Sequence, residues 1–169
     1  SKTLGDNNRM PEAIFNMEQT INFVQNKIDT TNIEYISILR FAANAYYFIG
    51  KPQLTLEYYN RAINLLIING KYPSVLANTY LFAAMHLERF NSHALASNYY
   101  NNALEAVKNS PGNYNMATYY FIIASRLDVV QIDSRIEMYK AVIYYCEKGG
   151  FTDSHIYFES LQKLGINYS

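Results

Sequence analysis

One pattern, Tyr-Tyr-Asn-x-Ala, occurs twice in the chain, at 58–62 and again at 99–103. With their flanks the two copies read EYYNRAI (57–63) and NYYNNAL (98–104), and a less similar copy, EMYKAVI, occupies 137–143. Each copy follows, at nearly the same distance, a segment rich in small residues: FAANAY at 41–46, FAAMHL at 82–87 and IIASRL at 122–127. A period of about 40 residues is typical of stacked helical hairpins. The repeat therefore predicts a helical-repeat fold.

The residue types in the repeat explain why it recurs. Two helices approach each other closely only where one of them carries small side chains. Residues 42–43 and 83–84 are both Ala-Ala and provide such positions. Tyr59 and Tyr100 then fill the space between one hairpin and the next. We therefore interpret these tyrosines as packing residues and not as a substrate-binding motif.

Helix start and stop signals divide the chain at regular intervals, and no segment alternates with the two-residue period of a strand. Pro52 and Pro73 suit the first turn of a helix. Ser134 and Glu137 have the spacing of a capping box, and Gly149 suits a helix end. The chain is predicted to be all-α. The predicted helices are residues 11–28, 33–49, 52–68, 73–89, 92–109, 114–127, 133–148 and 153–165.

The first repeat resembles the tetratricopeptide pattern. Ala43 occupies the small packing position of the first helix and Tyr46 follows three residues later. Gly50 suits the turn, and Tyr59 and Ala62 match the aromatic and small positions of the second helix. The resemblance implies a right-handed α-solenoid of tetratricopeptide-like hairpins, with about three repeats plus flanking helices.

We expect a single domain over residues 11–169 after a flexible N-terminus at residues 1–10. The predicted helix at 11–28 has the pattern of the second helix of an earlier repeat. It is therefore either a cap or the remaining half of that repeat. The last helix has an apolar stripe that closes the array or forms a homodimer contact (Ile156, Phe158, Leu161 and Leu164). The predicted segments are a half repeat or cap at 11–28, repeats at 33–69, 73–109 and 114–148, and a capping helix at 153–165.

The first helices of stacked hairpins line the concave side of such an array, so their inward positions are the candidate binding site. Polar side chains there can bond a peptide backbone, apolar ones can pack on it, and Arg40 can bind a carboxylate. Solvated helix faces also carry Asn and Ser, which is the alternative interpretation. The predicted peptide-binding residues are Ser37, Arg40, Asn44, Asn78, Leu81, Met85, Thr118, Phe121 and Ser125.

The register of the third repeat is open at this stage. Val142 stands where the other copies have Ala62 and Ala103. A shift of the alignment there replaces the third set of groove residues with Met116, Tyr119 and Ile123.

Composition and motifs argue against other functions. Fourteen basic and fourteen acidic side chains leave no net charge, so we expect no binding of nucleic acid by this chain itself. The longest apolar stretches, such as AVIYYC and YYFIIA, are too short for a membrane span. The single cysteine, Cys146, lies in an apolar run and is expected to be a buried, inert thiol in a reducing compartment. The three histidines have no metal-ligand spacing, and no nucleophile motif or phosphate loop is visible. The chain is therefore predicted to be no enzyme and to need no cofactor or metal.

The long repeats resemble those of the cytoplasmic peptide-pheromone receptors of Gram-positive bacteria, the Rap, NprR and PlcR family. The likeness covers roughly residues 16–107, from NMEQTINFVQ to YYNNALEAV. It implies a cytoplasmic sensor domain that binds a short imported peptide and controls a transcription regulator. Asn44 and Asn78 match the family's asparagines that hold the peptide backbone, whereas Met85 departs from them.

Two alternatives stay open beside this resemblance. The sequence contains no helix-turn-helix, so a DNA-binding part would have to lie outside it. The chain is then either the sensor of a peptide-responsive regulator, or a protein–protein scaffold or secretion chaperone without a signalling role. Arg40 and Asn44 also match two members of the carboxylate clamp of chaperone adaptors, but the other members are missing.

Overall fold

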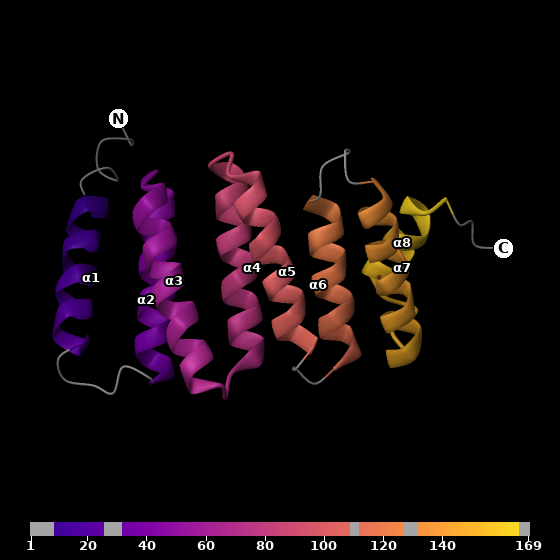
Figure 1. The fold of residues 1–169 in the computed structure, drawn as a ribbon, viewed down its shortest axis with the longest axis horizontal. Helices are drawn as coiled ribbons and strands as arrows, with labels where there is room; N and C mark the ends of the chain where they lie inside the picture. The colour runs from indigo at the N-terminus through magenta and orange to yellow at the C-terminus, as the bar shows by residue number, and fades with distance from the viewer. Residues whose placement is uncertain (1–8, 26–31, 109–111, 127–131, 166–169) are drawn as a thin grey trace. The chain divides into compact units, whose positions relative to one another are not determined.

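The computed structural model describes residues 9–25, 32–108, 112–126 and 132–165. Within these residues the chain forms eight α-helices and no β-strand (Figure 1). The helices are α1 (Arg9–Gln25), α2 (Ile33–Phe48), α3 (Pro52–Asn69), α4 (Pro73–Arg89), α5 (His93–Lys108), α6 (Asn113–Arg126), α7 (Ile132–Gly149) and α8 (His155–Lys163). The all-α fold class predicted from the sequence is confirmed over this part of the chain.

The helix boundaries follow the local signals in the sequence. Pro52 and Pro73 start α3 and α4, as predicted, because a residue in the first turn needs no partner for its N–H group. Gly70 follows α3 with φ of 67° and Gly150 follows α7 with φ of 75°. This left-handed conformation, which glycine adopts without a steric cost, ends both helices.

Two predicted details differ in the structure. Helix α7 begins before Ser134, so this residue lies inside the first turn and the predicted capping box does not start the helix. Glu137 instead pairs with Lys140, at 2.8 Å. Helix α8 begins two residues later than predicted, because a turn in which the Ser154 N–H donates to the Phe151 carbonyl (3.1 Å) precedes it.

The chain divides into two compact units, residues 1–99 and 100–169, with the boundary inside α5. Each unit is described by itself below. A single domain over residues 11–169 therefore stays a prediction.

In the first unit α2 and α3 form a hairpin, α1 packs against α2, and α4 packs against α3 (Figure 1). Ala42 and Ala43 of α2 and Ala62 of α3 are completely buried. These small side chains let the two helices approach closely. Tyr59 is buried beside them, which confirms its predicted packing role.

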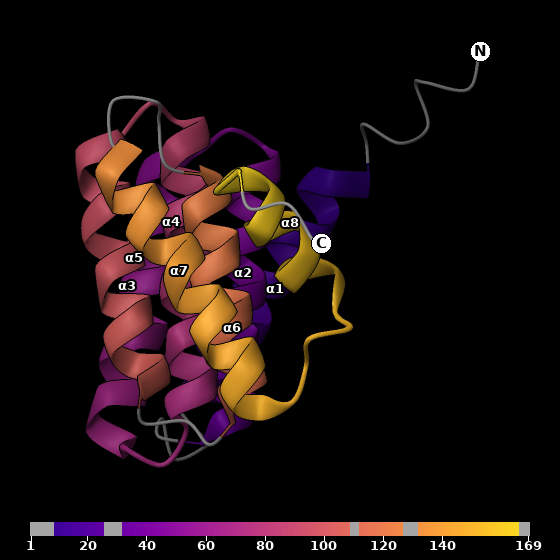
Figure 2. The same cartoon turned by 90° about the vertical axis from the view of Figure 1, so that its right-hand side faces the viewer.

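In the second unit α6 and α7 form another hairpin, and α8 packs on α7 and reaches α6 (Figure 2). The buried core contains Ala117, Val142, Cys146, Tyr157 and Leu161. Burial also raises the pKa of the Cys146 thiol, which agrees with the prediction of an inert cysteine.

Helix α8 uses much of its predicted apolar stripe within its own unit. Leu161 is buried, Ile156 packs against the core, Leu164 is half-buried, and Phe158 is exposed, at 48%. A homodimer contact through this helix therefore stays a prediction. Among the described helices, none has the length and apolar composition of a membrane span.

Candidate functional site

The first unit presents phenylalanine side chains on one side of its two first-of-hairpin helices. On α2 the exposed residues Ser37, Phe41 and Phe48 are four and seven positions apart, which places them on one side of a helix. The opposite side of α2 carries the buried residues Ile36, Leu39, Ala42, Ala43 and Tyr46. Because the opposite side of α2 is buried in the unit, the side with Ser37, Phe41 and Phe48 is the one that faces solvent.

Helix α4 repeats this arrangement in the next hairpin. Asn78, Phe82 and Arg89 are exposed at the positions of Ser37, Phe41 and Phe48. The exposed fractions of the three phenylalanines are 67% for Phe41, 74% for Phe48 and 41% for Phe82. We call this surface the phenylalanine face; it consists of Ser37, Phe41, Phe48, Asn78, Phe82 and Arg89.

The structure separates the groove residues predicted for the first unit into three groups. Ser37 and Asn78 are exposed and lie on the phenylalanine face, and Arg40, Asn44 and Met85 are half-buried beside it. Leu81 is different because only 5% of it is exposed. It supports α4 from the core side. The Ser37 hydroxyl donates to the Ile33 carbonyl at 2.8 Å, inside its own helix.

A polar network fixes the side chain of Asn44. The Tyr59 hydroxyl donates to Asn44 Oδ1 at 2.7 Å, and Nδ1 of His86 lies 3.1 Å from the same hydroxyl. The His86 ring stacks on Tyr47, with ring centroids 3.7 Å apart and planes within 3°. The network thus joins α2, α3 and α4.

The protonation of this network follows from its geometry. Since the single hydroxyl proton of Tyr59 goes to Asn44, Nδ1 of His86 must carry the proton that it donates to the Tyr59 oxygen. Burial, and secondly the charge of Arg89, lower the pKa of His86 to about 4. Burial likewise raises the pKa of Tyr59 above its usual value. The network is therefore neutral at neutral pH, and the Asn44 NH₂ group remains as a donor for a ligand.

The groove residues predicted in the third repeat lie in the second unit, on α6. Thr118 and Phe121 are half-buried and Ser125 is exposed. Phe121 packs edge-on against Tyr139, with ring centroids 6.3 Å apart. Ser125 donates to the Ile122 carbonyl at 2.7 Å.

The alternative register for this repeat is less accessible. Met116, Tyr119 and Ile123 are all buried, with exposed fractions of 6%, 7% and 0%. The first register therefore fits an accessible surface better. One groove through the residues of both units stays a prediction.

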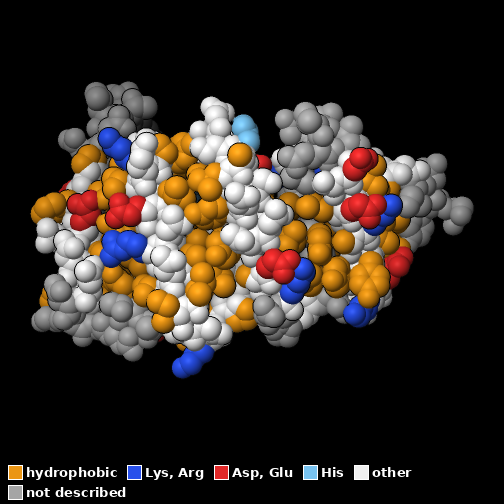
Figure 3. Space-filling view, in the orientation of Figure 1, with side chains coloured by type: hydrophobic (Ala, Val, Ile, Leu, Met, Phe, Trp, Pro, Cys, Tyr) orange, Lys and Arg blue, Asp and Glu red, His pale blue; other side chains and the backbone are white. Residues whose placement is uncertain are grey.

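Some charged side chains of the second unit form pairs within one helix. Glu105 binds Lys108, and Glu137 binds Lys140, each within one helix turn. Figure 3 shows acidic and basic side chains next to each other over these helices, without a basic stripe on the face that is drawn. Exposed pairs of this kind contribute a few tenths of a kcal/mol to stability.

Residues 9–25, 32–108, 112–126 and 132–165 contain no group of three or more His, Cys, Asp or Glu side chains that could hold a metal ion. The His86 ring stacks on Tyr47 and bonds the Tyr59 hydroxyl, whereas His93 and His155 are exposed. The groups that the phenylalanine face and its neighbours offer are apolar side chains and hydrogen-bonding amides and hydroxyls, together with the charge of Arg40 and Arg89.

Phe41, Phe48 and Phe82 were not among the groove residues predicted from the sequence. The signal was present, because FAA at 41–43 recurs as FAA at 82–84. From the sequence alone, however, an apolar residue next to two packing alanines is expected to be buried in the core. Only the burial of the opposite side of the helix shows that these rings face solvent.

No protein-family model and no curated protein matches the chain. Solved structures, however, do match the chain. A putative kinesin light chain of Podosopora anserina with nearly identical TPR-like repeats is 12% identical over 94% of this chain and 77% of its own, with a TM-score of 0.73, and its Q17M variant gives the same values. BtubC (BKLC) from P. vanneervenii is 16% identical over 96% of this chain and 69% of its own, with a TM-score of 0.67.

At these identities the likeness establishes the fold alone. The chain has an all-α solenoid fold of tetratricopeptide-like hairpins, as the repeat predicted. The resemblance to peptide-pheromone receptors stays an expectation.

Proposed function

We propose that the chain is a protein-interaction module whose phenylalanine face binds an extended segment of a partner protein. The observation that carries this proposal is the exposure of Phe41 and Phe82 at repeat-related positions of two neighbouring first-of-hairpin helices, with Phe48 exposed on the same side of α2. Exposed apolar groups that gather on one surface are typical of interaction sites. Aromatic side chains in particular contribute strongly to interfaces at a low entropy cost.

The polar side chains beside the phenylalanines suit a peptide backbone. The Asn44 amide is oriented by Tyr59, so its NH₂ group donates without first losing side-chain freedom. Ser37 and Asn78 provide further hydrogen-bonding groups at the same face. A ligand with regularly spaced amides and apolar side chains satisfies both kinds of group.

The finer form of this proposal is a sensor for a short peptide, and the alternative is a scaffold for a longer partner segment. Asn44 supports the sensor, because a fixed backbone donor increases affinity most for a ligand with few contacts. In the sensor the domain would control a regulator to which it is joined. In the scaffold the bound segment would be part of a folded partner.

The test is a screen of immobilised ten-residue peptides, followed by calorimetric titration of the strongest binders into the purified chain. We expect Phe41→Ser and Phe82→Ser each to weaken binding about tenfold or more. The matched control is Ile68→Ser on α3, which is 71% exposed but lies outside the phenylalanine face. Equal weakening by the control, or none by either phenylalanine variant, would overturn the proposal.

Asn44→Ala separates the two forms. If free peptides of fewer than about ten residues bind and lose their affinity in this variant, the sensor is supported. If only long segments bind, and Asn44→Ala changes their affinity less than about twofold, the scaffold is supported.

A further inference from the structure

A second polar site lies where α1, α2 and α3 meet. Arg61 of α3 donates through Nη2 to Gln25 Oε1 of α1 at 3.1 Å and to the Tyr35 hydroxyl of α2 at 3.0 Å. Its guanidinium also lies over the Tyr58 ring, 5.1 Å from the centroid. One arginine side chain is thus held by partners from three helices.

All the partners of Arg61 in the described part of the chain are electrically neutral. Its hydrogen bonds go to the neutral groups of Gln25 and Tyr35, and it takes no part in the ion pairs of Lys108, Lys140 and His155. A half-buried cation is usually paired with a carboxylate, because its charge is costly to bury alone. Gln25 and Tyr35 use one guanidinium nitrogen, and among the described residues no other acceptor bonds Nε or Nη1, so these nitrogens retain donors.

Arg61 borders a cavity of about 300 Å³, whose other lining residues are Gln25, Tyr35, Asn64 and Leu65. This volume corresponds to about ten water molecules and to the lower end of the range of ligand sites. The amides of Gln25 and Asn64 can donate to an anion, and Leu65 provides an apolar wall. The cavity suits a group the size of an amino-acid side chain.

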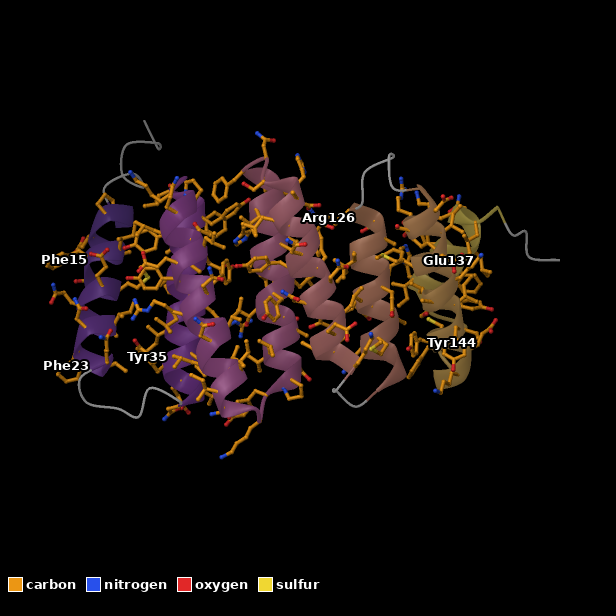
Figure 4. The ribbon with its side chains drawn as sticks, in the orientation of Figure 1. Phe15, Phe23, Tyr35, Arg126, Glu137 and Tyr144 are labelled. Atoms are coloured by element: carbon orange, nitrogen blue, oxygen red, sulfur yellow. The ribbon has the colours of Figure 1, made fainter. Side chains whose placement is uncertain are left out.

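The arrangement is not a general feature of the repeat. The positions that correspond to Tyr35 and Arg61 in the next repeat hold Leu76 and Asn102. Neither residue can reproduce the hydroxyl or the guanidinium, so packing of the repeat does not require this pair. The site also differs from the phenylalanine face, because Tyr35 is buried on the side of α2 that faces α1 (Figure 4).

We propose that this cavity binds a carboxylate carried by a partner protein, with the Arg61 guanidinium as its main contact. A guanidinium matches a carboxylate through two parallel hydrogen bonds. The cavity lining contains one cation, which balances one carboxylate but not the nearly doubled charge of a phosphomonoester. The carboxylate is that of an Asp or Glu side chain or of a chain terminus.

The experiment is an NMR titration of the Arg61 Nε–Hε signal in the intact chain. The probes are acetyl-Gly-Glu-Gly-amide, which carries only a side-chain carboxylate, and acetyl-Gly-Gly-Gly with a free terminus. Acetyl-Gly-Gln-Gly-amide is the neutral probe, and inorganic phosphate tests for a different anion. We expect saturable shifts with one or both carboxylate probes and none with the neutral peptide. Shifts with phosphate alone, or with no probe, would overturn the proposal.

Variants separate this site from other cations and from the fold. The backbone amide of residue 61 and its neighbours reports binding where the guanidinium is absent. We expect Arg61→Gln to weaken carboxylate binding about tenfold or more and Arg61→Lys to weaken it less, because Lys lacks the fork. Lys51→Gln, which removes an exposed cation just before α3 and outside both proposed sites, is the control and should leave binding unchanged.

If Arg61→Gln fails to fold, Asn64→Leu provides the same test, since it fills the cavity and keeps the arginine. Carboxylate binding that persists in Asn64→Leu, or that is lost equally in Lys51→Gln, would contradict the proposed site. Phe41→Ser should leave this titration unchanged, so failure of the phenylalanine-face proposal is distinguishable from failure of this one.

Discussion

Helices α1 and α3 carry packing residues at the same spacing, in line with the prediction that α1 is a half repeat or a cap, but they have different neighbours. Ala13, Met17 and Thr20 of α1 correspond to Thr55, Tyr59 and Ala62 of α3, with the same spacing in both helices. In α3, which packs on both α2 and α4, all three positions are buried. In α1, which packs on α2, only Met17 is buried, whereas Ala13 and Thr20 are exposed.

The comparison shows which side of each helix is buried by a neighbouring helix. Met17 and Tyr59 mark the side that faces the following hairpin, and it is buried in both helices. Helix α3 also packs on α2 through another of its sides. Among the described residues, no helix covers the corresponding side of α1. Phe15 and Phe23, 59% and 61% exposed, point away from α2 on the outer side of α1 (Figure 4). Exposure in α1 thus follows from its neighbours and not from its residue types.

The largest expected effect is at the position that both helices bury. Tyr59→Ala should lower the free energy of unfolding by about 4 kcal/mol, because it leaves a cavity between three helices and removes a partner of Asn44 and His86. Met17→Ala should cost about 2 kcal/mol, since α1 has one packed side. Urea unfolding followed by circular dichroism measures both. Equal losses would mean that the two helices are packed alike.

The repeat pattern was enough to predict the helices, their order and their packing residues. Apolar period, proline and glycine are local signals, and they set each boundary to within three residues. What the pattern could not show is which side of a helix lacks a neighbour. Ala13 and Thr20 have the same small size as buried repeat residues, so the sequence alone does not reveal that they are exposed.

The next effect concerns the small positions, where the two helices should respond differently. Ala62→Leu adds three carbon atoms to a completely buried site and should cost about 2 kcal/mol. Thr20→Leu at the equivalent exposed site should change stability by less than about 0.5 kcal/mol. The same urea experiment compares them. A large loss in Thr20→Leu would show that the open side of α1 is packed in solution.

The candidate site was predicted less completely than the fold. Repeat positions placed Ser37, Asn44 and Asn78 at or beside an accessible surface, but the same rule also selected the buried Leu81. The rule failed there because Leu81 and Arg40 occupy the same repeat position, yet the leucine turns toward the core while the arginine is half-exposed. The repeat pattern could not predict the Arg61 cavity. The cavity depends on contacts among three helices, and its residues do not recur in the next repeat.

The smallest expected effect is a pH dependence that belongs to the α3–α4 junction only. There Tyr59 meets His86, whereas the equivalent positions at the α1–α2 junction hold Met17 and Ala45, which do not titrate. The pKa of His86 is about 4 in the folded chain and about 6.5 when unfolded, so the unfolded state binds the extra proton first. This contribution to stability is present above pH 6.5 and is lost as the pH falls toward 4.

Because His86 is only partly buried, we expect the loss over that interval to be about 1 kcal/mol. His86→Gln keeps a hydrogen-bonding group near Tyr59 and removes the titration, so the difference between the two pH profiles of unfolding isolates this histidine from the carboxylates. Parallel profiles would contradict a neutral His86 in the folded chain. Stability that instead falls as the pH rises above 6.5 would mean that the folded state holds the imidazolium, contrary to the burial and the Arg89 charge that lower the pKa of His86.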